Sequence, residues 1–233
     1  LGQTQTTGYN LTNSLRFRNS AAPYLSRTPA TTGTGGGKTF TYSCWAKLDC
    51  VGNYNWLLIG GLLGSSADCA LYIDSVGQMK FNDRPSGAYV NSTAVYRDPA
   101  AWYHFVFAVD TTQATAANRI KMYVNGVQTT SFSSTNYPAQ NTVLNIGINQ
   151  PQRVCTRDDG NTSSFYLAET NFIDGQQLAA SSFGSTNSTT GVWQPKAYTG
   201  TYGTNGFYLK FTDIATTSGS NAGLGKDFSG NGN

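Results

Sequence analysis

The chain has 233 residues, of which 12% are charged, about half the share that is usual in soluble proteins. Only one acidic residue is a glutamate, so the sequence lacks the charged side chains that cover helices in water, and a helical bundle or coiled coil is excluded. The formal charge of +3 is too small for nucleic-acid binding that depends on neutralising phosphates, and 13% aromatic residues are too many for a disordered chain.

One domain is expected to occupy most of the chain. We predict a polar lead-in over residues 1–13 and a single β domain over residues 14–215. Residues 216–233 would then be a loop segment, a last strand or a linker to a following module. The longest apolar run, residues 56–63, contains two glycines and is too short to cross a bilayer, so no membrane insertion is expected.

The first half of the domain shows a series of short strands. Residues 14–17 alternate in polarity, and a Gly/Thr loop follows at residues 31–38. Residues 40–47 alternate clearly, except that Trp45 falls on the polar side, which indicates that this face of the strand is partly covered. Further strands are predicted at residues 56–59, 70–73 and 79–81.

The second half begins with the strongest pattern in the chain. Residues 102–109 are apolar at nearly every position, as in a strand that is covered on both faces. Residues 120–124 alternate, and Asn125–Gly126 favours a type I′ hairpin turn because both residues tolerate positive φ. Later strands are predicted at residues 143–148, 165–173 and 207–211, with one helical turn near residues 179–183. Ten to twelve short strands predict an all-β, two-sheet antiparallel jelly-roll sandwich.

Several of these strands carry motifs of a known family. Thr39–Lys47 (TFTYSCWAK) resembles the "fT-x-s-x-W-v-k" strand of laminin-G-like, concanavalin A-like domains. Residues 102–106 and 121–127 together resemble the "W-h-h-v … k-l-Y-v-N-G" pair of that family, and residues 145–147 and 166–175 resemble two of its later strands. The resemblance covers residues 14–211 and implies a concanavalin A-like, laminin-G-like sandwich.

Other segments are similar to the copies of this domain in structural proteins of tailed bacteriophages, especially marine ones. They are residues 97–104, 109–115, 171–176, 191–196 and 225–233. The resemblance implies a virion appendage such as a tail or head fibre, assembled in the host cytoplasm beside other virion subunits, and a homo-oligomer such as a trimer. Residues 226–233 resemble a motif that opens domains of this fold class, and they either complete this domain or start the next one.

Catalysis is not expected from this sequence. The glycoside hydrolases of the fold class hold two glutamates close together, and retaining hydrolysis needs two carboxyl groups about 5–5.5 Å apart. Glu169 is the only glutamate, and the adjacent acids Asp158 and Asp159 would point to opposite sides of a strand. The only histidine, His104, lies inside the apolar run of residues 102–109 and is expected to be a core residue.

Calcium is the one cofactor left open. Laminin-G-like domains often hold one Ca²⁺ through an aspartate and loop carbonyls. Asp158 and Asp159 form the densest acidic loop, and Asp83 and Asp110 are further candidates; the alternative is that all are solvated turn carboxylates. The four cysteines, at positions 44, 50, 69 and 155, match no zinc spacing and are expected to be reduced, with a Cys50–Cys69 disulfide as the alternative.

After catalysis and metal binding, sugar binding is the remaining function for which the sequence offers candidate residues. Neutral glycans are held by aromatic faces that stack on C–H surfaces and by amide, hydroxyl, arginine and aspartate groups, and a surface poor in charge but rich in Tyr, Asn, Ser and Thr suits that task. The candidate residues are loop aromatics and the charged residues near them: Tyr54, Trp56, Asp83, Arg84, Tyr89, Tyr137, Arg153, Arg157 and Asp158. For each aromatic residue taken alone, structural packing is the alternative.

Two hypotheses for the function follow. In the first, the chain is a non-catalytic module of a virion appendage that recognises a glycan of the host cell surface during attachment. In the second, it is a purely structural module that joins subunits into a fibre, tube or shell. An oligomer that buries the loop aromatics would favour assembly, and a monomer that exposes them would favour recognition.

Overall fold

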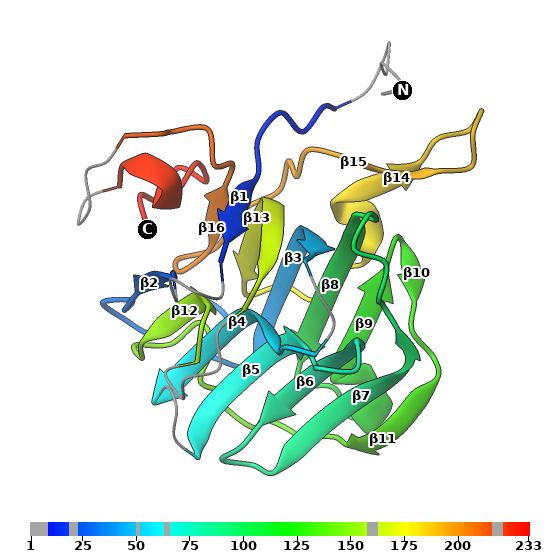
Figure 1. Ribbon diagram of the computed structural model, residues 1–233. Coiled ribbons are helices and arrows are strands. Elements are labelled where there is room, and N and C mark those ends of the chain that lie inside the picture. The colour runs from blue at the N-terminus through cyan, green and yellow to red at the C-terminus, as the bar shows by residue number, and fades with distance from the viewer. Residues whose placement is uncertain (1–8, 19–22, 50–51, 63–65, 158–162, 216–220) are drawn as a thin grey trace.

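The computed structural model describes residues 9–18, 23–49, 52–62, 66–157, 163–215 and 221–233. Two antiparallel sheets pack face to face, with the strands β4 to β7 crossing in front of β3, β8 and β9 in Figure 1. This confirms the all-β, two-sheet jelly-roll sandwich that the sequence predicts. The helical segments of the described residues are single 3₁₀ turns, and none of them could cross a membrane.

The first sheet, which we call the β3 sheet, has the strand order β1–β13–β3–β8–β9–β10, and β16 also pairs with β13. Its strands are β1 (Leu15–Phe17), β3 (Thr39–Leu48), β8 (Tyr103–Asp110), β9 (Ile120–Val124), β10 (Val127–Gln128), β13 (Phe165–Asp174) and β16 (Phe207–Leu209). The second sheet, the β5 sheet, has the order β11–β7–β6–β5–β4–β12–β2. Its strands are β2 (Leu25–Arg27), β4 (Asn55–Leu62), β5 (Ala67–Ile73), β6 (Gln78–Asp83), β7 (Ala88–Val95), β11 (Phe132–Asn136) and β12 (Gln152–Cys155).

Alternate positions of both sheets fill the core between them. On β8, Phe105 and Phe107 point into this core, while Leu71 and Phe81 reach it from the β5 sheet. Burying these large apolar side chains is the main stabilisation of the sandwich. Three cysteines, Cys44, Cys69 and Cys155, are buried as free thiols, so the alternative Cys50–Cys69 disulfide is wrong, and Cys50 itself lies outside the described residues.

A third layer covers the outer face of the β3 sheet. The chain after β13 folds back through a 3₁₀ turn, Ala180–Ser182, and a hairpin of β14 (Gly184–Thr186) and β15 (Trp193–Pro195). Phe183 packs there on Val106 and Ala108 of β8. The layer explains why β8 is buried on both faces and why Trp45 is buried although it points away from the core, as the sequence predicts.

The C-terminal segment folds onto the end of β16. Asp227 forms a bridge with Leu209, and its carboxylate accepts hydrogen bonds from the backbone N–H groups of Tyr208 at 2.8 Å and of Asn233 at 2.9 Å. The Asn231 amide donates to the carbonyls of Gly203 and Gly206. The motif at residues 226–233 therefore packs against this sandwich.

Two local predictions have opposite outcomes. Asn125 and Gly126 have φ values of 48° and 85°, and Val124 pairs with Val127, so the two-residue hairpin turn is confirmed. The strand predicted at residues 143–148 is wrong. Leu144 and Ile146 are buried in alternation, but the Leu144 N–H donates to Gly37, so this backbone bonds to the irregular glycine loop instead of a strand.

Candidate functional site

The outer face of the β5 sheet carries a group of aromatic and charged side chains. Leu71 points into the core, whereas its neighbour Tyr72 points outward and is paired with Lys80 of β6. Trp56 of β4 is the partner of Tyr72 on the other side and joins the same face. We name this group, with its charged neighbours, the Trp56 cluster; it consists of Tyr54, Trp56, Asp68, Tyr72, Arg84 and Arg157.

Three rings form the aromatic part of the Trp56 cluster. The ring centroids of Tyr54 and Trp56 lie 5.4 Å apart with planes only 11° from parallel, and the Tyr72 ring lies 4.6 Å from Trp56. Trp56 is buried beneath its neighbours, while Tyr54 is 37% exposed. A buried ring thus supports an accessible one, and stacked rings of this kind hold a fixed orientation.

Two arginines share one carboxylate beside these rings. Arg157 Nε lies 2.6 Å from Asp68 Oδ2, and Arg84 Nε lies 3.2 Å from Asp68 Oδ1. The Arg157 guanidinium also lies 5.7 Å from the centre of the Trp56 ring. Asp68 and Arg157 are buried, whereas the Arg84 side chain is exposed. Since removing one partner would leave a buried charge uncompensated, Asp68 holds Arg157 beside the Trp56 ring and Arg84 at the edge of the cluster.

The cluster also presents neutral donors. Burial raises the pKa of Tyr72 to about 12, so its hydroxyl stays protonated at neutral pH. The Trp56 indole N–H is buried and, within the described residues, has no hydrogen-bond partner. An unsatisfied buried donor costs about 1–3 kcal/mol, so this N–H is a local cost to the stability of the cluster and is not exposed at its surface.

The structure brings together four of the residues chosen from the sequence: Tyr54, Trp56, Arg84 and Arg157. Tyr89 lies on the same outer face, since it pairs with Asn82 of β6. Arg153 also faces outward, at the β12 end of the sheet, where its guanidinium lies 4.2 Å from the centre of the Tyr24 ring.

The remaining candidates lie elsewhere. Asp83 is paired with Cys69, points to the inner side of the sheet, and accepts hydrogen bonds from Ser86. Tyr137 packs against the core. Asp158 lies outside the described residues, as does Asp159.

Asp68 and Tyr72 belong to the site but are not among the residues chosen from the sequence. Both lie on the same side of β5 as Ala70, so alternation counted from Ala70 would have found them. The predicted strand at residues 70–73 starts after Asp68, which therefore looks like part of a loop.

The calcium candidates of the sequence are not gathered into a cluster of acidic side chains in the described part of the chain. The described residues contain no group of three or more His, Cys, Asp or Glu side chains that could hold a metal ion. Asp110, a candidate from the sequence, accepts hydrogen bonds from Thr39, Thr112 and Gln113, so protein donors already surround its carboxylate. The acidic pair Asp158 and Asp159 lies outside the described part of the chain.

The only histidine and the only glutamate of the sequence belong to the β3 sheet and not to the Trp56 cluster. His104 is fully buried, and the Trp193 indole donates to its Nδ1 at 3.0 Å, the position that a carboxylate takes in a catalytic triad. The Glu169 carboxylate accepts hydrogen bonds from the hydroxyls of Tyr9 and Tyr208.

Several solved structures are similar to this chain at low sequence identity. A proposed carbohydrate-binding protein from Bacteroides ovatus has a TM-score of 0.51 at 13% identity, over 87% of this chain and 54% of that one. Domains LG4–5 of the mouse laminin α1 chain have a TM-score of 0.50 at 12% identity, over 87% and 51%. The heptameric pentraxin of Limulus polyphemus has a TM-score of 0.46 at 14% identity, over 74% and 75%.

This chain thus spans about half the length of the Bacteroides and laminin structures, and the likeness to them shows the fold alone. No curated protein matches the sequence. Residues 19–165, more than half of the chain, match the family model described as the concanavalin A-like lectin/glucanases superfamily. Together with the two-sheet sandwich, this match shows that the chain belongs to the concanavalin A-like lectin/glucanases superfamily.

Proposed function

We propose that this chain is a non-catalytic module that recognises glycans, and that the Trp56 cluster is its binding site. The observation that carries the proposal is the stack of Tyr54 on Trp56 and Tyr72, held beside the Arg157–Asp68–Arg84 network. The accessible Tyr54 ring would stack on the C–H face of a sugar, and the guanidinium of Arg84 would donate to its hydroxyl oxygens. The membership in a lectin-containing superfamily supports this assignment.

A binding role fits the number and the placement of the acid and base groups. Retaining glycoside hydrolysis needs two carboxyl groups about 5–5.5 Å apart, and a chain with one glutamate does not have the glutamate pair of the family's hydrolases. Glu169, in the β3 sheet, accepts hydrogen bonds from the hydroxyls of Tyr9 and Tyr208. His104, in the same sheet, is buried beneath Trp193. The residues of the Trp56 cluster are therefore suited to hold a sugar and not to cleave it.

The biological setting that we propose is a virion appendage of a tailed bacteriophage, such as a tail or head fibre. Its basis is the sequence resemblance at residues 97–104, 171–176 and 191–196. In that setting the ligand is a glycan of the host cell surface, bound during attachment. The partners are other virion subunits and further copies of this chain.

A glycan array with bacterial surface polysaccharides tests the binding function. We expect the folded chain to bind a defined subset of glycans, and Tyr54→Ala to weaken binding about tenfold because the stacking surface is lost. Trp102→Ala is the matched control, since Trp102 has the same 37% exposure but lies beside β8 of the other sheet, and it should bind like the parent.

An array without signal, in the presence and in the absence of Ca²⁺, would contradict the proposal. Sedimentation of the same sample then decides whether the second hypothesis, assembly of virion subunits, takes its place. A stable oligomer in which Tyr54 is protected from chemical modification of tyrosines would support assembly, whereas a monomer with Tyr54 accessible would not.

A further inference from the structure

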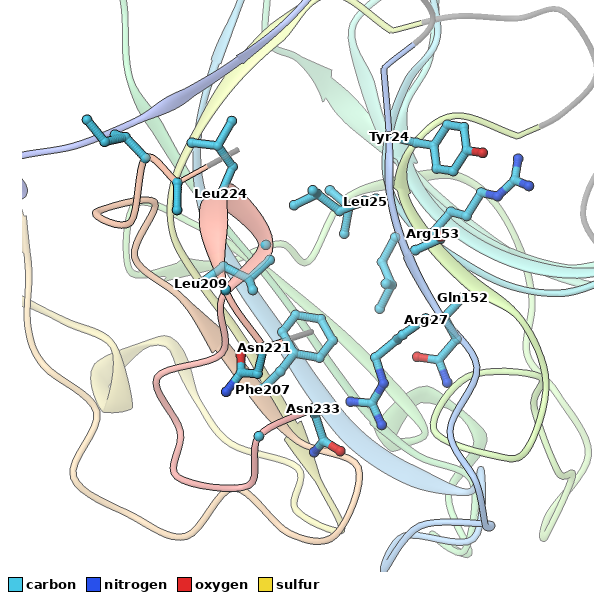
Figure 2. Close-up of a pocket in the computed structure, with 18 residues that line it drawn as sticks. Tyr24, Leu25, Arg27, Gln152, Arg153, Phe207, Leu209, Asn221, Leu224 and Asn233 are labelled. Atoms are coloured by element: carbon cyan, nitrogen blue, oxygen red, sulfur yellow. The ribbon is translucent and has the colours of Figure 1, made fainter. Parts of the chain in front are cut away.

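A groove with a volume of about 1000 Å³ lies between the two sheets at their open edge, away from the Trp56 cluster. Four consecutive residues, Tyr24 to Arg27, line it on one side, so the groove follows β2 along its length. Phe207 and Leu209 of β16 and Leu224 form the opposite side (Figure 2). The groove thus has a strand on each side, β2 and β16.

The β2 side of the groove is an unpaired strand edge. β2 is the last strand of the β5 sheet, pairs with β12 on one side, and has no strand partner on the other side among the described residues. Such an edge presents backbone N–H and C=O groups that can pair with another extended chain. An extended peptide can form main-chain hydrogen bonds with this edge, whereas an acyl chain cannot, so the edge favours a peptide as the occupant of the groove.

Apolar side chains dominate one end of the groove. Leu25, Leu209 and Leu224 lie around this end in Figure 2, and Leu224 is 41% exposed. Ile214, which also lines the groove, is 81% exposed. Side chains at alternate positions of an inserted strand would point toward these residues and cover them.

Arg27 gives the other end of the groove a positive charge. Its guanidinium lies near Gln152 and Asn233 in Figure 2 and donates one hydrogen bond, from Nη1 to the Asn205 carbonyl at 3.1 Å. Within the described chain, Arg27 forms no ion pair. Burial lowers the pKa of this guanidinium, although Asp227 and Asp174 oppose the shift from a distance. Since both carboxylates already accept backbone N–H groups, a half-buried arginine is left without a direct counter-ion.

We propose that this groove binds an extended peptide segment of a partner protein, added as a strand to the free edge of β2. The segment would place apolar side chains at alternate positions between Leu25 and Leu209 and an acidic group at Arg27. Main-chain hydrogen bonds supply affinity in this mode of recognition, and the apolar and charged contacts supply specificity. This site is independent of the glycan site on the outer face of the β5 sheet.

The test uses a fluorescein-labelled peptide of eight residues that alternates valine with threonine and ends in glutamate. We expect saturable binding in fluorescence anisotropy, at least tenfold weaker when alternate amides of the peptide are N-methylated and cannot pair with β2. Arg27→Gln should remove the preference for glutamate over glutamine at the peptide end, because it keeps a donor for Asn205 but loses the charge. Leu224→Glu should weaken binding about tenfold.

Two variants serve as matched controls. Arg97 also donates to one backbone carbonyl and is exposed, so Arg97→Gln removes an equivalent charge outside the groove. Val127→Glu places a carboxylate on an exposed position of β10. Both should bind the peptide like the parent. Equal binding of the N-methylated peptide, displacement of the peptide by decanoate alone, or parent-like binding by Leu224→Glu would each overturn the proposal.

Discussion

Glu169 lies at an irregularity of β13, where its backbone has a φ of 47°. This left-handed conformation is rare for residues other than glycine and costs about 1–3 kcal/mol, so the surrounding contacts must hold it in place. The hydroxyls of Tyr9 and Tyr208 donate to its carboxylate at 2.8 Å, and burial raises the pKa of that carboxyl. One side chain thus ties the N-terminal lead-in and β16 to the same strand.

Replacing Glu169 separates its backbone conformation from its side-chain contacts. Glu169→Ala and Glu169→Gly both lose the tyrosine hydrogen bonds, but glycine adopts the left-handed conformation without strain. We therefore expect the glycine variant to be more stable than the alanine variant by about 1 kcal/mol in urea unfolding. At Ala168, which has no positive φ, glycine should destabilise, and an equal effect of both Glu169 substitutions would contradict this explanation.

His104 is the second residue whose state is set by its contacts. Because the Trp193 indole can only donate, Nδ1 is the acceptor, and Nε2 carries the proton that faces Ser43 Oγ at 2.8 Å. The ring is stacked on Trp45 with centroids 5.0 Å apart. Burial lowers the pKa of His104 to about 3, so the imidazole is neutral in the folded protein.

This pKa predicts a loss of stability in mild acid. The unfolded chain binds a proton at His104 near pH 6.5, whereas the folded chain does not until about pH 3, so stability is lost as the pH falls through this window. The loss is about 2 kcal/mol between pH 6.5 and 5. Urea unfolding at pH 7, 6 and 5 should show a flatter dependence for His104→Gln than for the parent.

Asp83 and Glu169 act in the opposite direction, because burial raises the pKa of each carboxyl, so the folded state gains stability as they bind protons. They are present in both proteins and cancel in the comparison. Parallel pH profiles for His104→Gln and the parent would show that His104 does not set this dependence.

At the scale of the element, the hairpin of β14 and β15 depends on the space that Trp193 occupies. A Cβ atom at Gly126 or at Gly184 would lie 2.4 Å from the Trp193 ring. Gly126 also has a positive φ of 85°, whereas Gly184 does not have a positive φ. Gly191, at φ 70°, has open space around it.

These three glycines predict a ranking of alanine variants. Gly191→Ala should cost about 1 kcal/mol, from backbone strain alone. Gly184→Ala should cost about 1–3 kcal/mol through overpacking, and Gly126→Ala should cost more than either because both effects act. Unfolding free energies give the order, and hydrogen exchange of the hairpin amides should speed up only when Trp193 is displaced. A larger loss for Gly191→Ala than for Gly184→Ala would contradict the packing argument.

Elements with a strong local pattern were predictable from the sequence, and those that depend on a distant partner were not. Residues 102–109 and the Asn125–Gly126 turn carry their own signals. β2 and β12 have three and four residues and are defined by pairing with each other across more than one hundred positions, which no local pattern records. The same limit explains Leu144 and Ile146, whose burial alternates although their backbone bonds to a loop.

In the Trp56 cluster too, residues with a local signal were predictable, and residues whose role depends on a distant partner were not. Aromatic and charged residues such as Trp56 and Arg157 could be chosen by their chemistry alone. The role of Asp68 depends on Arg157, which lies 89 positions away and reaches it through sheet pairing. Asp83 and Arg84 are candidates because both lie beside Tyr89 in the sequence. Asp83, the last residue of β6, pairs with Cys69 and points to the inner side of the sheet, whereas Arg84 follows the strand and reaches Asp68 on the outer face.

At the scale of the whole molecule, the chain forms three layers: the β5 sheet, the β3 sheet and the segment after β13, which differ in what their outer faces contact. The segment after β13 covers the outer face of the β3 sheet with Phe183 and Trp193, so that face serves stability. The outer face of the β5 sheet keeps Tyr54, Arg84 and Tyr89 available to a ligand, while the groove beside β2 remains open at the edge. We therefore expect that the proposed glycan site on this face and the proposed peptide site in the groove can be occupied at the same time.

The low charge of the molecule predicts that glycan binding depends little on salt. The net charge is +3 over 233 residues, and the two arginines of the Trp56 cluster share Asp68, so long-range attraction is small. Stacking on Tyr54 is not screened by ions. For a glycan identified on the array, calorimetry should show an affinity change below about threefold between 50 and 500 mM NaCl, whereas binding through 6–10 phosphate contacts falls about 10³-fold or more between 50 and 200 mM. Heparin provides the control, since any binding of this polyanion should weaken steeply over the same range. A steep salt dependence for the array glycan would show that charge and not aromatic stacking dominates the Trp56 cluster.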